Sequence, residues 1–182
     1  MATNTFIALL RGINVSGCNK IKMTELQQLF IELGFKNVTT YIQSGNVVFQ
    51  TNLTEIDKIE QQIINSIKKT FGYVVQVIVL TKKSLETIYA ANPFLQEPNI
   101  DITKLHVTLL SNKPNQNDIV PLKTLSKNED TFINVDKTIY LYCPNGYGKT
   151  LLNNNLFEKK LKISATTRNW NTISKLVEIS NL

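Results

Sequence analysis

A polar loop near the N-terminus organises the chain around it, and it reads Leu9-Leu10-Arg11-Gly12-Ile13-Asn14-Val15-Ser16-Gly17-Cys18-Asn19-Lys20-Ile21-Lys22. Residues 6–10 form an apolar run that is too short for a helix and typical of a buried strand. After the loop, apolar residues repeat at helical spacing from Met23 to Leu33. The loop therefore joins a strand to a helix. Its backbone N–H groups and lysines favour an anion there, although its glycines equally suit positive backbone φ angles.

The first half of the chain predicts a split βαβ arrangement. Residues 38–43 and 46–50 are β-rich, and the dipeptide Ser44-Gly45 between them favours a tight hairpin. An apolar stripe from Ile56 to Phe71 predicts a second helix, and residues 74–80 close the unit as a strand. This order is typical of a ferredoxin-like (βαββαβ) subdomain, which packs two helices on one face of an antiparallel sheet.

The second half predicts a smaller α+β subdomain. Residues 105–111 alternate as a strand, and residues 132–135 and 139–142 form a hairpin across Asp136-Lys137. A basic helix follows near residues 152–161, and an amphipathic helix ends the sequence. The order of elements resembles that of the first half, although no residue-level repeat is present.

Turn signals separate the two halves. The dipeptides Asn92-Pro93 and Glu97-Pro98 are typical of a connection between subdomains. We therefore expect an α+β protein with a ferredoxin-like subdomain over residues 1–91 and a connection over residues 92–103. A second α+β subdomain with a C-terminal helix is expected over residues 104–182.

Composition indicates a globular protein with a substantial core. The chain has 182 residues, of which 42% are hydrophobic. No apolar run approaches the length of a membrane helix, and the N-terminus lacks the pattern of a secretory signal, so we expect a cytoplasmic protein without membrane contact. Cys18 and Cys143 have no CxxC spacing, which indicates reduced thiols instead of a disulfide or a zinc site.

The net charge of +6 is concentrated in the C-terminal quarter. Residues 137–175 hold seven basic residues and one acidic residue, while the rest of the chain carries 13 of each. Attraction for anions is expected there, although a solvated basic face is the simpler interpretation. Arg11 and Arg168 are the only arginines. Because a guanidinium fork binds phosphate or carboxylate through two bonds, a shared anion and a structural ion pair are both open.

We predict a ligand-binding site made of polar loop residues. Arg168 is expected at the start of the last helix, where the helix dipole disfavours a cation, so it requires a partner. The leading hypothesis is a binding module for a phosphate-bearing ligand, either nucleic acid or a nucleotide, at which the cations converge from three loops. The candidate residues are Arg11, Asn14, Lys20, Lys22, Gln43, Asn46, Lys149, Arg168 and Asn169.

The sequence contains no recognisable catalytic constellation, so a non-enzyme is the favoured interpretation. His106 is the only histidine and lies in a predicted strand, as a packed or edge residue. Residues 143–150 resemble a nucleotide-binding loop, but Cys143 stands where the first glycine is required, which favours a plain tight turn with at most a phosphate contact from Lys149. With no metal-ligand spacing or cofactor motif, we expect neither metal nor cofactor.

Four separated blocks of the sequence resemble one known family. They read Ala8-Leu9-Leu10-Arg11-Gly12-Ile13-Asn14-Val15, Lys20-Ile21-Lys22-Met23, Tyr41-Ile42-Gln43-Ser44-Gly45-Asn46-Val47-Val48-Phe49 and Thr167-Arg168-Asn169-Trp170-Asn171-Thr172. Over nearly the whole chain they are similar to the family called domain of unknown function 1697. The resemblance implies an α+β protein with a ferredoxin-like N-terminal half, found mostly in bacteria, without an established activity or catalytic residues.

Two other interpretations of the polar loops stay open. In the first, Asn14, Gln43, Asn46 and the two arginines line the pocket of an enzyme that acts on a small anionic substrate. In the second, the asparagine and arginine side chains are structural and tie the loops together. The sequence does not indicate an oligomeric state.

Overall fold

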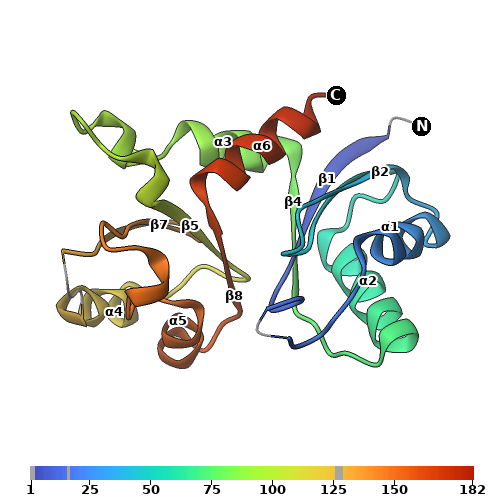
Figure 1. Ribbon diagram of the computed structural model, residues 1–182, viewed down its shortest axis with the longest axis horizontal. Coiled ribbons are helices and arrows are strands. Elements are labelled where there is room, and N and C mark those ends of the chain that lie inside the picture. The colour runs from blue at the N-terminus through green and yellow to red at the C-terminus, as the bar shows by residue number, and fades with distance from the viewer. Residues whose placement is uncertain (1–2, 16, 126–128) are drawn as a thin grey trace. The chain divides into compact units, whose positions relative to one another are not determined.

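The structure is a computed structural model that describes residues 3–15, 17–125 and 129–182 (Figure 1). The chain forms two compact units. Unit 1 consists of Met1–Thr87 with Lys175–Leu182, and unit 2 consists of Ile88–Ser174. Two helices, α3 (Lys82–Ala90) and α6 (Trp170–Ser180), contribute residues to both units.

The described residues form an α+β fold with two four-stranded antiparallel sheets and six α-helices. This confirms the predicted α+β class. The connection predicted over residues 92–103 contains the 3-10 helices η1 (Pro93–Gln96) and η2 (Ile102–Lys104). Among the helices in the described ranges, none is long and apolar enough to cross a lipid bilayer.

Unit 1 builds one sheet and covers it with two helices. Its elements follow in the order β1 (Asn4–Leu10), α1 (Met23–Glu32), β2 (Lys36–Tyr41), β3 (Asn46–Thr51), α2 (Ile56–Phe71) and β4 (Val77–Thr81). The sheet has the strand order β2-β3-β1-β4, and every neighbouring pair is antiparallel. The order of elements agrees with the order that hydrophobic periodicity predicts.

The core of unit 1 lies between its sheet and the helices α1 and α2. Because side chains alternate along a strand, Phe6, Ala8 and Leu10 of β1 all enter this core. Phe49 of β3 packs against aromatic neighbours, and its ring centroid lies 4.5 Å from that of Phe35. Burial of these apolar side chains supplies the main driving force for folding the unit.

The connection between β2 and β3 is longer than predicted. Residues 42–45 form the turn, in place of the two-residue Ser44-Gly45 hairpin. Ile42, a β-branched residue, has a φ of 49°, which is an unfavourable conformation for such a side chain. The sequence signal for a tight hairpin was therefore correct about the position of the turn and wrong about its length.

Gly45 ends this turn at a point of close approach. Its φ is 76°, and a Cβ added there would lie 2.7 Å from Ile13 Cδ1 and 2.8 Å from Leu10 Cβ. Both the positive φ and the missing side chain are required, so glycine is the residue that fits.

Unit 2 builds a second sheet from the later part of the chain. Its elements are β5 (Leu105–Leu110), α4 (Gln116–Ile119), η3 (Val120–Leu125), β6 (Thr131–Val135), β7 (Thr138–Tyr142), η4 (Tyr147–Lys149), α5 (Asn154–Leu161) and β8 (Ala165–Asn169). The hairpin across Asp136-Lys137 is confirmed. Strand β8 was not predicted, because its sequence Ala-Thr-Thr-Arg-Asn lacks an apolar alternation.

Unit 2 repeats the strand order of unit 1. When β5, β6, β7 and β8 are matched to β1, β2, β3 and β4, the order β6-β7-β5-β8 coincides with β2-β3-β1-β4. Backbone hydrogen bonds at one end of each sheet also match. They join Leu10 N to Gly45 O and Leu110 N to Lys137 O, and they join Arg11 N to Gln76 O and Ser111 N to Ser164 O.

We predict that Gly45→Ala destabilises the protein more than Gly72→Ala. Both glycines have a φ of 76°, but an added Cβ meets nothing within 4 Å at Gly72. The Gly72 variant should therefore show only backbone strain of about 1 kcal/mol, whereas overpacking should raise the loss at Gly45 to about 2–4 kcal/mol. Urea unfolding of both variants measures the difference, and equal losses would contradict the close approach at Gly45.

Candidate functional site

The loop between β1 and α1, residues 11–22, is held in place by the side chain of Asn14. This residue has a φ of 55°. Its Nδ2 donates hydrogen bonds to Ile21 O and to Gln43 O, both at 2.9 Å, and its Oδ1 accepts one from Ile21 N at 2.9 Å. One amide therefore closes the loop on itself and joins it to the turn at residues 42–45.

Two further asparagines support the same region. Asn19 has a φ of 46°, and its Nδ2 donates to Gly12 O at 3.1 Å. Asn46 is fully buried, and its Nδ2 donates to Tyr41 O at 2.9 Å and to Ser44 Oγ at 3.0 Å. These amides bond to the chain's own backbone and hydroxyl groups. Their contacts agree with the interpretation in which the asparagines tie loops together.

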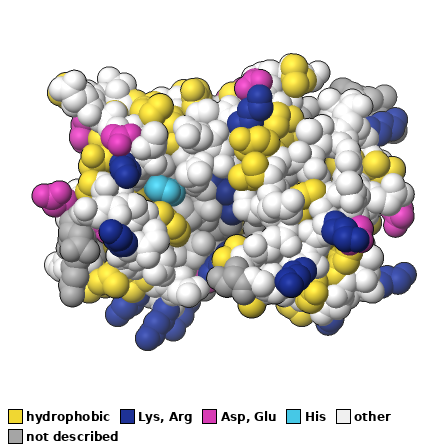
Figure 2. Space-filling view, in the orientation of Figure 1, with side chains coloured by type: hydrophobic (Ala, Val, Ile, Leu, Met, Phe, Trp, Pro, Cys, Tyr) yellow, Lys and Arg dark blue, Asp and Glu magenta, His cyan; other side chains and the backbone are white. Residues whose placement is uncertain are grey.

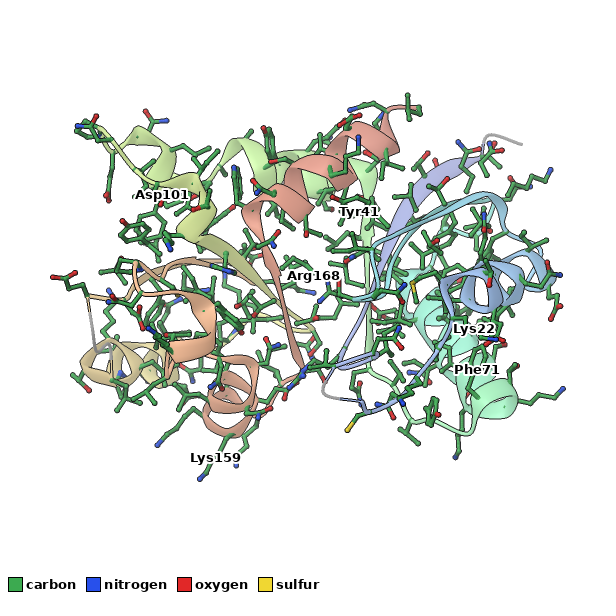
Figure 3. The ribbon with its side chains drawn as sticks, viewed as in Figure 1. Lys22, Tyr41, Phe71, Asp101, Lys159 and Arg168 are labelled. Carbon is green, nitrogen blue, oxygen red and sulfur yellow. The ribbon has the colours of Figure 1, made fainter. Side chains whose placement is uncertain are left out.

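The cations of this loop face solvent to different degrees. Lys20 is exposed, and Arg11 is half-buried, with its backbone N–H donating to Gln76 O at 2.8 Å. The side chain of Lys22, labelled in Figure 3, is 80% exposed, and its Nζ lies 3.5 Å from the Glu25 carboxylate. An ion pair this exposed holds its partners weakly, so Lys22 can exchange it for another anion.

Lys22 also stands at the start of α1. It is the N-cap residue, and its side chain makes no capping hydrogen bond. The N–H groups of the first helical turn lack partners within the helix, so the positive end of the helix dipole meets solvent beside Lys20 and Lys22. Glu25 in this turn already supplies one negative charge. The geometry suits an anion that displaces the Glu25 contact of Lys22.

Gln43 is the remaining candidate of unit 1. Its side chain is exposed on the 42–45 turn, while its backbone oxygen accepts the Asn14 bond. The structure thus brings six candidates together at one end of unit 1, and these are Arg11, Asn14, Lys20, Lys22, Gln43 and Asn46. The other three candidates belong to unit 2.

Arg168 lies in strand β8, which corrects the expectation that it begins the last helix. It is 8% exposed, and its Nη1 donates to Thr166 Oγ1 at 2.9 Å and to Thr167 O at 3.0 Å (labelled in Figure 3).

Asn169 and Lys149 also have clear local roles. Asn169 Oδ1 accepts a hydrogen bond from Thr172 N at 2.8 Å, which caps the start of α6. Lys149 is exposed at the end of η4, and its backbone N donates to Gly146 O at 3.0 Å. This turn is the tight turn that the sequence favours for residues 143–150.

Burial shifts the pKa of two reactive side chains of unit 2, His106 and Cys143. The His106 ring stacks on Tyr147 with centroids 4.8 Å apart, and its Nδ1 lies 3.1 Å from Lys104 O. Burial lowers the pKa of His106, so the ring is neutral at pH 7. Burial, with a smaller effect of Asp130, raises the pKa of the Cys143 thiol to about 11, so it is not a thiolate.

Metal-binding side chains do not gather in the described ranges. There, no group of three or more His, Cys, Asp or Glu residues is arranged to hold a metal ion. The candidate site therefore consists of cations, amides and backbone N–H groups, which bind anions.

Comparisons with known proteins relate the chain to a family and to solved structures of similar fold. The model of the family described as "Protein of unknown function (DUF1697)" matches residues 3–140. The structure of the conserved bacterial protein SP0830 from Streptococcus pneumoniae is similar, with a TM-score of 0.78 and 21% sequence identity, over 98% of this chain and 99% of that one. At this identity the likeness concerns the fold alone. No curated protein matches the sequence.

We predict that Asn14→Gly lowers the free energy of unfolding by about 2–3 kcal/mol, because three hydrogen bonds of about 1 kcal/mol each are lost. Glycine tolerates the φ of 55°, so the loss reports the hydrogen bonds and not backbone strain. Asn19→Gly is the matched control, since it also has a positive φ but loses one bond and should cost about 1 kcal/mol. Urea unfolding compares the two, and equal losses would contradict the role of Asn14.

We predict that His106 makes the protein less stable in mild acid. Because the folded pKa lies below the unfolded value of 6.5, the unfolded chain binds a proton more readily. Stability should therefore fall as the pH drops from about 7 toward about 5.5. Thermal unfolding of His106→Gln should give a flatter profile in this window. An unchanged slope in the variant would show that another group causes the effect.

Proposed function

The chain belongs to the family described as "Protein of unknown function (DUF1697)", and on that premise we propose that it is a binding module for a phosphate-bearing ligand, a nucleotide or nucleic acid. The observation that supports the proposal is that the asparagines and the lysines of the 11–22 loop make different contacts. Its asparagines bond to the backbone, whereas Lys20 and Lys22 extend into solvent. Because these hydrogen bonds already order the described residues of the loop, the loop loses less conformational freedom when it binds an anion.

The polar residues at this end of unit 1 have different roles in binding the anion. Lys20 and Lys22 contact phosphate oxygens, and the first N–H groups of α1 donate to the same anion. Arg11 is the residue whose planar guanidinium can bind phosphate through two bonds. Gln43 adds an uncharged donor and acceptor from the facing turn. Asn14 and Asn46 position these groups.

We also propose that unit 1 is ferredoxin-like. The proposal is supported by the order β1-α1-β2-β3-α2-β4 and by the strand order β2-β3-β1-β4 with antiparallel neighbours. In RNA-binding members of that architecture, bases stack on aromatic side chains of the sheet. In unit 1 the face of the sheet opposite the helices carries the aliphatic residues Ile7, Leu9 and Val48. Among the described strand residues, Tyr41 is the one aromatic residue on this face. Contact through the phosphates is therefore favoured over base stacking.

For unit 2 we propose that Lys149 offers a phosphate contact of its own, because its side chain is exposed at a turn. Arg168 and Asn169 are assigned supporting roles, since Arg168 donates hydrogen bonds to Thr166 and Thr167 within β8 and Asn169 caps the start of α6. A cytoplasmic location is proposed as well. It is supported by the free thiols of exposed Cys18 and buried Cys143, which suit a reducing compartment.

We predict that the double variant Lys20→Gln/Lys22→Gln weakens binding of adenosine triphosphate and inorganic pyrophosphate by about tenfold or more, because two phosphate contacts are lost. Isothermal titration calorimetry at low and moderate salt measures the affinity, which should fall as salt rises. Lys68→Gln/Lys69→Gln is the matched control, since both residues are exposed and belong to the last turn of α2. The proposal would be contradicted if both variants bound the two ligands equally well, or if the unmodified protein did not bind them.

A further inference from the structure

Five lysines of unit 2 gather at one end of its sheet, and they form what we call the lysine edge. They come from three separate segments of the chain. The residues are Lys113, Lys137, Lys159, Lys160 and Lys162, and all five are exposed. None of them belongs to the candidate site described above.

Hydrogen bonds at Ser111 bring the three segments together. Ser111 N donates to Ser164 O at 2.9 Å, and Ser164 N donates to Ser111 Oγ at 3.2 Å. Lys137 Nζ donates to Ser111 O at 3.4 Å. Because Lys113 follows Ser111 closely and Lys162 precedes Ser164, the lysines of these segments share one surface.

Helix α5 adds the remaining charges. Lys159 and Lys160 are the basic residues of its last turn, and Lys162 is its C-cap with a φ of 58°. Lys159, labelled in Figure 3, points away from the ribbon. Figure 2 shows lysine or arginine side chains gathered on the surface below the position of α5.

Two carboxylates near this edge, those of Asp136 and Glu158, are already engaged. Asp136 Oδ1 lies 3.5 Å from Lys113 Nζ, and Glu158 Oε1 accepts a hydrogen bond from Ala165 N at 3.1 Å. Among the residues that the structure describes, Lys137, Lys159, Lys160 and Lys162 have no carboxylate within ion-pair distance. The edge therefore carries a net positive charge that is open to a polyanion.

The lysine edge lies at the end of the unit 2 sheet that corresponds to the loop end of the unit 1 sheet. The segments around Ser111, Lys137 and Ser164 correspond to the segments around Arg11, Gly45 and Gln76, since they make matching backbone hydrogen bonds. The matching end of each four-stranded sheet thus carries exposed lysines, which are Lys20 and Lys22 in unit 1 and the lysine edge in unit 2. In unit 2 the lysines come from three separate segments of the chain, which suits an extended ligand.

We propose that the lysine edge binds the phosphate backbone of nucleic acid without sequence preference. Lysines contact phosphates as point charges, whereas base reading relies on forked or aromatic side chains. A membrane surface fits less well, because the apolar residues Phe157 and Leu161 of α5 are buried in the core, so this helix has no apolar side to insert into a bilayer. The inference rests on unit 2 alone and holds whether or not the 11–22 loop binds a ligand.

The test compares Lys159→Glu/Lys160→Glu with Lys68→Glu/Lys69→Glu in the full chain. Both variants replace two exposed lysines in the last turn of a helix, so their effects on net charge and on the helix end are matched. Fluorescence anisotropy measures binding of labelled DNA duplexes and single strands of two unrelated sequences. The α5 variant should bind both sequences about tenfold or more weakly, and the α2 variant should bind within about threefold of the unmodified protein.

Salt dependence gives an independent readout. With about four phosphate contacts, the logarithm of the binding constant should fall against the logarithm of salt concentration with a slope of about −3.6, and the α5 variant should reduce that slope by about 2. Equal weakening by both charge reversals would overturn the proposal, as would a preference for one sequence. Binding to phosphatidylserine vesicles in place of DNA would also overturn it.

The Lys20→Gln/Lys22→Gln variant separates this inference from the proposed function. If that variant loses nucleotide binding and keeps DNA binding, both proposals are supported at separate surfaces. If the Lys20→Gln/Lys22→Gln variant loses DNA binding and the α5 variant keeps it, the nucleic-acid contact lies on the 11–22 loop. That result would overturn the proposal for the lysine edge. Circular dichroism spectra identical to that of the unmodified protein establish that each variant is folded.

Discussion

The three hydrogen bonds of the Asn14 side chain are the constraint on which the polar end of unit 1 depends. They connect residues that are 7 and 29 positions apart in the sequence, so they close two segments with one amide. Ordering a loop has an entropic cost that grows slowly with its length, and directed hydrogen bonds to backbone groups offset that cost. The close approach of Gly45 to Leu10 and Ile13 packs the same two segments together.

The hydrogen bonds of Asn14 explain why the asparagines of unit 1 have a structural role and the lysines do not. Asn14 and Asn46 lie in two of the sequence blocks that carry the family resemblance, and both bond to the chain itself. A phosphate ligand would have to compete with these internal bonds to reach them. Within the part of the chain that the structure describes, Lys20 and Lys22 make one weak, exposed ion pair, so we propose them as the contacts for an anion.

The repeated strand order places a comparable polar end in each unit. In unit 1 that end is a long loop pinned by asparagines, whereas in unit 2 it consists of short segments joined through Ser111. A pinned loop presents few cations in a defined arrangement, which favours a small ligand. A set of lysines on separate segments presents charge over a broad area, which favours a polymer whose affinity comes from counterion release.

Local patterns in the sequence were enough to predict the α+β class, strand β1 before the 11–22 loop, the apolar stripe of helix α2 and the hairpin at Asp136-Lys137. These features are predictable because hydrophobic periodicity and turn residues act within a few positions of the chain. They could not predict strand β8, whose polar residues acquire strand geometry by pairing with β5, or the length of the 42–45 turn. The role of Asn14 and the gathering of Lys113, Lys137 and Lys162 depend on groups far apart in the chain. Only the tertiary structure decided them, since hydrogen-bond partners and surface neighbours are set by which segments the sheets bring together.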